Sequence, residues 1–132
     1  MKLIVCLDDK NGMMFNNRRQ SQDRVLRERL LGMIDGKLYM SPYSAKMFGE
    51  NERIVIDSDY ASNAGENDFC FAEDKEVSLE RVNTIIIYRW NRLYPADKRF
   101  TFDLEALGYT KISSEEFIGS SHPVITEEIY RK

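Results

Sequence analysis

The chain has 132 residues, with 19 Lys and Arg side chains against 22 Asp and Glu side chains and a formal net charge of −3. Hydrophobic residues make up 42% and charged residues 31%, as in an ordinary globular protein, so we expect residues 1–132 to form one domain. No apolar run approaches the ~20 residues that span a bilayer, and Leu3–Leu7 is too short for a signal-peptide core. With one histidine and no clustered cysteines, the sequence excludes a histidine-rich metal centre.

The use of cysteine bears on the compartment. Cys6 and Cys70 both fall in predicted strands, where apolar neighbours favour a buried thiol over a disulfide. Free thiols are typical of a reducing environment. We therefore expect a cytoplasmic protein without membrane association.

Charge is distributed unevenly along the chain. Residues 1–32 carry seven basic and four acidic side chains, whereas residues 49–80 carry two basic and ten acidic ones. Five arginines lie within twelve positions, namely Arg18, Arg19, Arg24, Arg27 and Arg29. Because guanidinium forks match phosphate and carboxylate groups, this run is either a solvated helix face or a local site for an anionic ligand. The acidic stretch argues against a nucleic-acid surface that covers the whole protein, although a nucleotide- or RNA-binding role of the Arg18–Arg29 cluster stays open as an alternative.

Strands and helices are predicted to alternate in the first half of the chain. A buried strand over Leu3–Asp8 is followed by a helix over Ser21–Ile34. Lys37–Met40 is a short strand, after which Ser41-Pro42 provides a cap and a first-turn proline for a second helix that ends at Gly49.

The second half is predicted to be mainly strand. Its elements are, in order, a strand over Arg53–Asp57, a loop over Tyr60–Glu66, a strand over Phe69–Ala72, a short helix over Asp74–Val82, a strand over Thr84–Trp90, and a hairpin of Tyr109–Phe117 with Val124–Tyr130. Early alternation and a late hairpin predict an α/β protein in which helices cover a mixed sheet.

Asp23 lies where an apolar side chain is expected. On the predicted helix the apolar stripe is centred close to Asp23, and Arg27 lies one turn further along the same face. A carboxylate that points into a core must be paired or kept for chemistry. Two interpretations follow: an ion pair with Arg27 at the edge of the core, or a functional acid.

Several motifs, weak alone, occur in a specific order along nearly the whole chain. They are Lys2-Leu-Ile-Val-Cys-Leu-Asp-Asp-Lys-Asn-Gly-Met13, Gln22-Asp23, Lys37-Leu-Tyr-Met40, Ile86-Ile-Tyr88, Asp97-Lys-Arg-Phe100 and the His122–Lys132 tail. Together they resemble the dihydrofolate reductase family, in a divergent and shortened form. The resemblance implies a dihydrofolate-reductase-like α/β fold: a mixed, mostly parallel sheet with a C-terminal antiparallel hairpin, flanked by a few short helices. It also implies that Phe69–Ala72 lies between the first and second strands, with Arg53–Asp57 next outward.

The cofactor side departs from the family. There, paired glycines end a central strand and let the backbone approach the diphosphate of the cofactor. The equivalent stretch here is Phe71-Ala72-Glu73-Asp74, whose carboxylates would repel that anion. The expected Gly-Arg before the second helix is Ser41-Pro42, and only Ser44 matches the family's hydroxyl. The resemblance therefore favours no cofactor, with NADPH as the one candidate.

The substrate side is altered as well. The resemblance implies a catalytic pair of Asp23, the substrate-binding acid, and Tyr88, whose position shares a water or a hydrogen bond with that acid. The helix positions one and four after the acid, apolar or aromatic in the family, are Arg24 and Arg27. With Cys6 in the first strand and Ser44, these arginines are the candidate ligand-binding residues. One acid with two arginines favours a small, anionic molecule over folate.

Besides nucleotide or RNA binding by the Arg18–Arg29 cluster, two functions stay open. The first is a binding protein that has lost reductase chemistry and holds a small anionic, pterin-like or nucleotide-like ligand around Asp23, Arg27 and Tyr88. The second is an NADPH-dependent dihydrofolate or pterin reductase with an atypical cofactor site. We favour the first because two phosphate contacts are missing, which impairs the positioning that hydride transfer requires.

Overall fold

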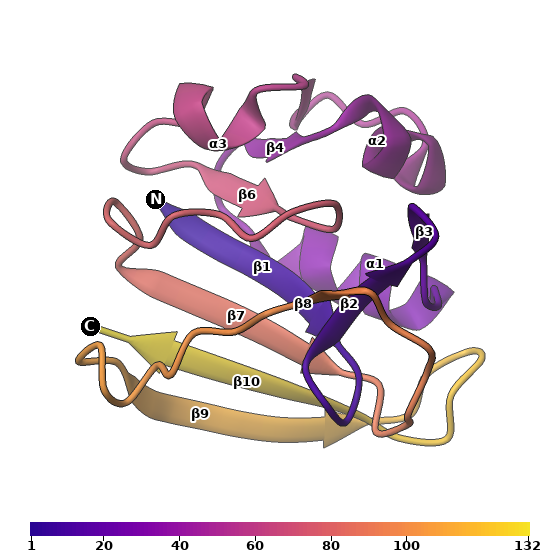
Figure 1. Ribbon diagram of the computed structural model, residues 1–132. Helices are drawn as coiled ribbons and strands as arrows, with labels where there is room; N and C mark the ends of the chain where they lie inside the picture. Colours follow the sequence, from indigo (N-terminus) through magenta and orange to yellow (C-terminus); the bar gives the residue numbers. More distant parts are fainter.

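Two sheets and three short helices make up the computed structural model, which describes residues 1–132 (Figure 1). The strands of the large sheet are β1 (Lys2–Leu7), β4 (Leu38–Met40), β5 (Ile54–Ile56), β6 (Phe69–Phe71), β7 (Thr84–Arg89), β9 (Thr110–Phe117) and β10 (Ile125–Arg131). The strands of the small sheet are β2 (Gly12–Phe15), β3 (Arg18–Arg19) and β8 (Lys98–Arg99). The helices are α1 (Arg24–Met33), α2 (Pro42–Phe48) and α3 (Tyr60–Asn63). None of them is long and apolar enough to cross a membrane.

The large sheet has the order β5-β4-β6-β1-β7-β10-β9. Strands β5, β4, β6, β1 and β7 pair in parallel, and β10 runs antiparallel to both β7 and β9. The predicted mostly parallel sheet with a C-terminal hairpin is therefore confirmed. So is the expected place of β6, between β1 and β4, with β5 next outward.

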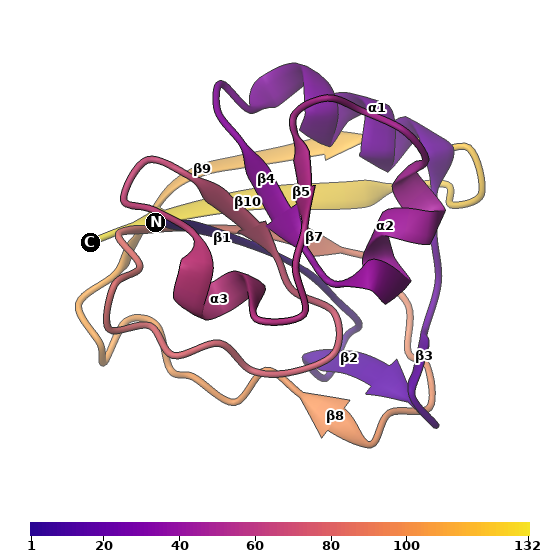
Figure 2. The ribbon, with the colours of Figure 1, turned by 90° about the horizontal axis from the view of Figure 1, so that it is seen from above.

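The sheet buries a core on each face. Alternate residues of β1 point to opposite sides, so that Leu3, Val5 and Leu7 join one core and Ile4 joins the other. The first core includes buried side chains of α3, and the second includes those of α1 and α2. Figure 2 shows α1 and α3 on opposite sides of the sheet, with β2 and β8 on the side of α3.

Capping residues determine where the two longer helices begin. Asp23 adopts an extended conformation (φ −152°) and accepts a hydrogen bond from Leu26 N, so α1 starts at Arg24 and not at Ser21 as predicted. Asp23 therefore does not lie on a helical face. Ser41 caps α2 and Pro42 takes its first position, as the sequence predicts.

Two local predictions are wrong. The Asp74–Val82 segment forms turns and no helix, and residues Tyr60–Asn63 form the short helix α3 inside the predicted loop. In the first segment Val77, Leu79 and Val82 are all buried, a spacing that one face of a helix does not provide. In the second, the fully buried Tyr60 anchors α3 in the core.

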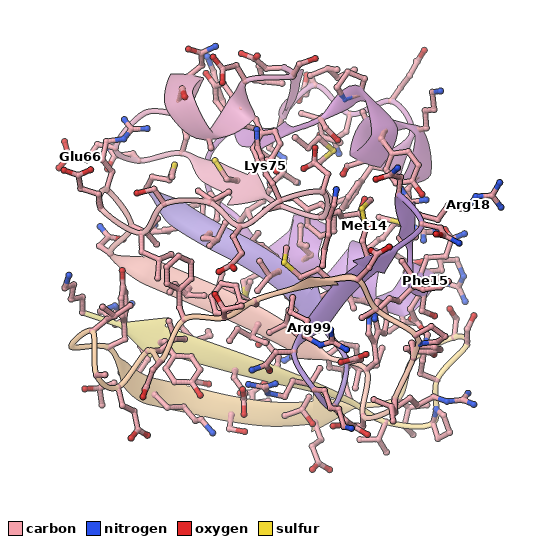
Figure 3. All side chains as sticks on the ribbon, in the orientation of Figure 1. Met14, Phe15, Arg18, Glu66, Lys75 and Arg99 are labelled. Carbon is pink, nitrogen blue, oxygen red and sulfur yellow. The ribbon has the colours of Figure 1, made fainter.

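A small hairpin that the sequence analysis did not predict covers part of the sheet. Asn16 and Asn17 both have positive φ (51° and 59°), as a two-residue turn of type I′ requires, and Phe15 pairs with Arg18 across it. Strand β8 pairs with β2 on the other side. Figure 3 shows Arg18 reaching outward from this hairpin.

Candidate functional site

The Asp23 carboxylate is buried, with 2% exposure, and accepts four hydrogen bonds. Oδ1 accepts from Leu26 N (3.1 Å) and Ser120 N (3.0 Å), and Oδ2 accepts from Ser121 N (2.8 Å) and His122 Nδ1 (2.9 Å). Burial raises the pKa of Asp23, but the His122 hydrogen bond and the three backbone N–H groups lower it more, so that the pKa lies well below its usual range. The carboxylate is ionised and has no vacant acceptor position for a ligand.

His122 connects Asp23 to a hydroxyl. The ring is 4% exposed, stacks on Trp90 with 4.6 Å between ring centroids, and places Nε2 2.9 Å from Ser21 Oγ and 3.3 Å from Tyr94 Oη. His122 lies 99 positions from Asp23, in the loop between β9 and β10. The sequence does not predict these partners, because Asp23, Ser21 and Tyr94 all lie far from His122 along the chain.

Three of the six sequence-predicted site residues line one cavity. Cys6, Asp23 and Arg27 share it, but its volume is only about 10 Å³. A single water needs at least ~10–15 Å³, so a pterin does not fit in this form of the protein. The Asp23–Arg27 ion pair does not form, and Arg27 Nη1 donates instead to Gln22 Oε1 at 3.2 Å.

Tyr88 belongs to a different network. Its buried hydroxyl donates to Glu127 Oε2 (2.9 Å), and Arg29 Nε donates to the same oxygen (2.9 Å). Burial, and next the Glu127 carboxylate, raise the pKa of Tyr88 far above its ordinary value. Tyr88 makes no hydrogen bond with Asp23, so the structure does not bring together the pair that the resemblance implies.

Ser44 lies at the start of α2, against an internal carboxylate. Its buried hydroxyl donates to Glu73 Oε1 (2.7 Å), while Arg19 binds Glu73 through Nε (2.9 Å) and Nη2 (3.1 Å) and lies over the Tyr43 ring. Burial, and next the Glu73 charge, raise the pKa of the Cys6 thiol well above its ordinary value, so Cys6 is a neutral thiol. Glu73 thus closes the space between β6 and α2.

The remaining arginines of the predicted cluster diverge. Arg24 pairs on the surface with Glu28 (2.7 Å), and Arg29 binds Glu115 and Glu127. Arg18 is exposed and makes no ion pair. The cluster therefore does not form one shared anion site.

An open pocket of about 480 Å³ lies between the β2–β3 hairpin and the segment after β7, and is lined by Phe15, Asn16, Arg18, Arg19, Gln20, Tyr94 and Pro95. Gln20 Nε2 donates to two acceptors, Asp8 Oδ2 (3.0 Å) and Pro95 O (3.2 Å), which settles the orientation of the amide. Gln20 Oε1 is then a buried acceptor without a partner. The volume falls in the range of small-molecule sites.

Comparisons with known proteins bear on the fold. No protein-family model matches the sequence, and a search of curated proteins finds no match. Among solved structures, dihydrofolate reductase from Enterococcus faecalis complexed with NADP(H) and RAB-propyl is similar over 98% of this chain and 94% of that chain, with a TM-score of 0.68 and 9% sequence identity. This chain has the dihydrofolate-reductase-like fold.

Within the dihydrofolate-reductase-like fold, the chain's own side chains fill both positions that the resemblance assigns to ligands. The end of β6, where the family has its glycine pair, carries Glu73, held by Arg19 and Ser44. The acid at the start of α1, Asp23, is saturated by its cap and by the β9–β10 loop. The sequence alone reveals the absence of the glycine pair. It does not reveal the hydrogen-bond partners of the two carboxylates, because these partners come from distant segments.

Proposed function

We propose that this protein binds a small anionic ligand and does not catalyse NADPH-dependent reduction. The observation that carries the proposal is the Glu73 carboxylate, which is 9% exposed and accepts from Arg19 and Ser44 at the end of β6. A cofactor diphosphate in the family's position would have to approach this carboxylate. The nearby cation, Arg19, is already engaged by Glu73, so the diphosphate would find no free guanidinium at this position.

The pocket at the β2–β3 hairpin is the better candidate for the ligand. Arg18 is a cation without a carboxylate partner there, and Phe15, Tyr94 and Pro95 provide apolar walls. A groove of about 640 Å³ between α2 and β5 is larger, but two carboxylates, Glu50 and Glu52, line it against one cation, Lys46. These two carboxylates disfavour an anion in the groove, so the hairpin pocket suits a carboxylate or phosphate attached to a small apolar body.

A melting screen of the whole protein tests both parts of the proposal. Phenyl phosphate and benzoate should raise the melting temperature, and NADPH and dihydrofolate should not. A ligand at a hundredfold excess over its Kd stabilises by ~2.7 kcal/mol, which corresponds to roughly 10 °C for a chain of this size.

Two arginine variants locate the site. Arg18→Gln should abolish the shift caused by phenyl phosphate and benzoate, because it removes the free cation of the pocket. Arg24→Gln is the matched control, since Arg24 is equally exposed but pairs with Glu28 on α1, outside the pocket. A shift of several degrees with NADPH, and none with the two small anions, would favour the reductase alternative and overturn the proposal.

A further inference from the structure

Ser21, His122 and Asp23 form a chain of two short hydrogen bonds. Ser21 Oγ lies 2.9 Å from His122 Nε2, and His122 Nδ1 lies 2.9 Å from Asp23 Oδ2. This order of hydroxyl, imidazole and carboxylate, connected through these atoms, is the arrangement that activates a serine nucleophile. It occurs on unrelated folds.

The protonation of the three groups follows from their partners. Because the Asp23 carboxylate is an acceptor only, His122 Nδ1 carries the hydrogen between them. In the neutral imidazole, Nε2 then presents a lone pair, to which Ser21 Oγ–H donates. Stacking on Trp90 (interplanar angle 26°) and 4% exposure hold the ring in this orientation.

Ser21 is the least buried residue in the chain of hydrogen bonds. It is half-buried and lines the small cavity of about 10 Å³ that Asp23 also lines, whereas His122 and Asp23 are buried. Tyr94, whose hydroxyl lies 3.3 Å from His122 Nε2, lines the open 480 Å³ pocket together with Gln20, the residue before Ser21. The backbone N–H of Gln22, the residue after Ser21, has no hydrogen-bond partner within the protein and is a candidate donor to an oxyanion.

We propose that Ser21, His122 and Asp23 constitute an acyl-transfer site that hydrolyses small esters. Ser21 Oγ forms a bond to the ester carbonyl carbon while its proton passes to His122 Nε2. The bond from that carbon to the alkoxy oxygen breaks, and the leaving alcohol takes the proton. Water repeats the two proton transfers on the acyl-serine, which releases the carboxylic acid and restores Ser21. Asp23 is a positioning residue, because it acts through His122.

Labelling with a fluorophosphonate tests the nucleophile directly, and independently of the proposed anion pocket, because this probe is uncharged. The adduct should lie on the Gln20–Arg24 tryptic peptide, in which Ser21 is the only hydroxyl residue. Mapping on the unaltered protein by mass spectrometry needs no variant, so the result does not depend on whether a substitution folds. Ser21→Ala should abolish the adduct, and Ser58→Ala, at an exposed serine outside the site, should not.

Hydrolysis of 4-nitrophenyl acetate tests the complete site. The folded protein should hydrolyse this ester faster than its heat-denatured form does, and Ser21→Ala should lower the rate of hydrolysis at least tenfold. Asp23→Asn, assayed below its unfolding transition, should lower kcat at least tenfold with KM unchanged, because it disturbs the His122 tautomer and not the pocket. The proposal is overturned if the Gln20–Arg24 peptide carries no adduct while a serine hydrolase in parallel is labelled, or if denatured protein is labelled equally.

Discussion

Replacing Asp23 by Asn should destabilise the fold, because an amide cannot satisfy four donors. Turned with its nitrogen at the Oδ1 position, the amide opposes the N–H groups of Leu26 and Ser120. Turned the other way, it opposes Ser121 N–H, while His122 can shift its hydrogen to Nε2 and accept at Nδ1. The second orientation costs less free energy, because it leaves only the Ser121 N–H without an acceptor and changes the tautomer of His122.

The size of the loss follows from this count. A buried donor without an acceptor costs ~1–3 kcal/mol, and the hydrogen bonds that keep a neutral in place of a charged acceptor weaken by ~1 kcal/mol. We therefore expect Asp23→Asn to lower the free energy of unfolding by about 2–4 kcal/mol at pH 7. With an unfolding entropy of roughly 0.3 kcal/mol per degree for a chain of this length, the melting temperature should fall by about 7–14 °C in circular-dichroism melts.

The loss should depend on pH. Because the folded state lowers the pKa of Asp23, its contribution is complete above the unfolded value of about 3.9 and is lost as the pH falls toward the lower folded pKa. The difference in the free energy of unfolding between the variant and the unaltered protein should therefore become smaller below about pH 4. Asp35→Asn, at an exposed carboxylate without side-chain hydrogen bonds, is the control and should change stability by less than ~0.5 kcal/mol. A variant equal to this control at pH 7, or a gap that widens in acid, would refute the reasoning.

Three further substitutions probe the close contacts of the fold, each measured by thermal or urea unfolding. Gly119→Ala should lower the stability as much as Asp23→Asn, because the added Cβ would lie 2.9 Å from Asp23 Cγ. Gly32→Ala has open space within α1 and should stabilise the protein by up to ~1 kcal/mol. Equal effects of the two substitutions would contradict this packing. Glu127→Gln should cost ~1–3 kcal/mol by weakening a buried hydrogen bond from Tyr88 and a partly buried one from Arg29. An unchanged stability would show that these bonds contribute nothing. Residue 17 has φ 59°, so Asn17→Gly should be neutral or stabilise the protein by about 0.5 kcal/mol, and Asn17→Val should destabilise it. A valine variant more stable than the glycine variant would exclude the type I′ turn.

Elements with strong local signals could be predicted from the sequence. The apolar run of β1 and the Ser41-Pro42 start of α2 each depend on neighbouring residues alone, and both form as expected. The place of β6 between β1 and β4 is not a local property, and the resemblance to dihydrofolate reductase supplied it. The hairpin turn at Asn16-Asn17 was also local, since two residues that tolerate positive φ stand between Phe15 and Arg18, but this signal was missed.

The site was less predictable, because its contacts join distant segments. Helical periodicity placed Asp23 on a buried stripe beside Arg27, but as an N-cap Asp23 precedes the helix and turns toward the β9–β10 loop. The partner that replaces Arg27 is His122, 99 positions away. No spacing in one sequence reveals such a pair. Ser120 and Ser121 give no signal either, because they bind Asp23 through backbone N–H groups, which any residue except proline provides.

Binding and catalysis need polar groups that the fold leaves unsatisfied. Asp23 and Glu73 stand at the two positions that the resemblance assigns to ligands, and their carboxylates are occupied by donors from the chain itself. The groups with remaining capacity lie elsewhere. The Arg18 guanidinium and the unpaired Gln20 Oε1 belong to the pocket at the β2–β3 hairpin. Tyr94 lines the same pocket and lies beside the His122 imidazole, which also contacts the Ser21 hydroxyl. Because these unsatisfied groups gather at one pocket, the anionic ligand is to be sought there, whereas Ser21 itself lines the closed space between α1 and α2.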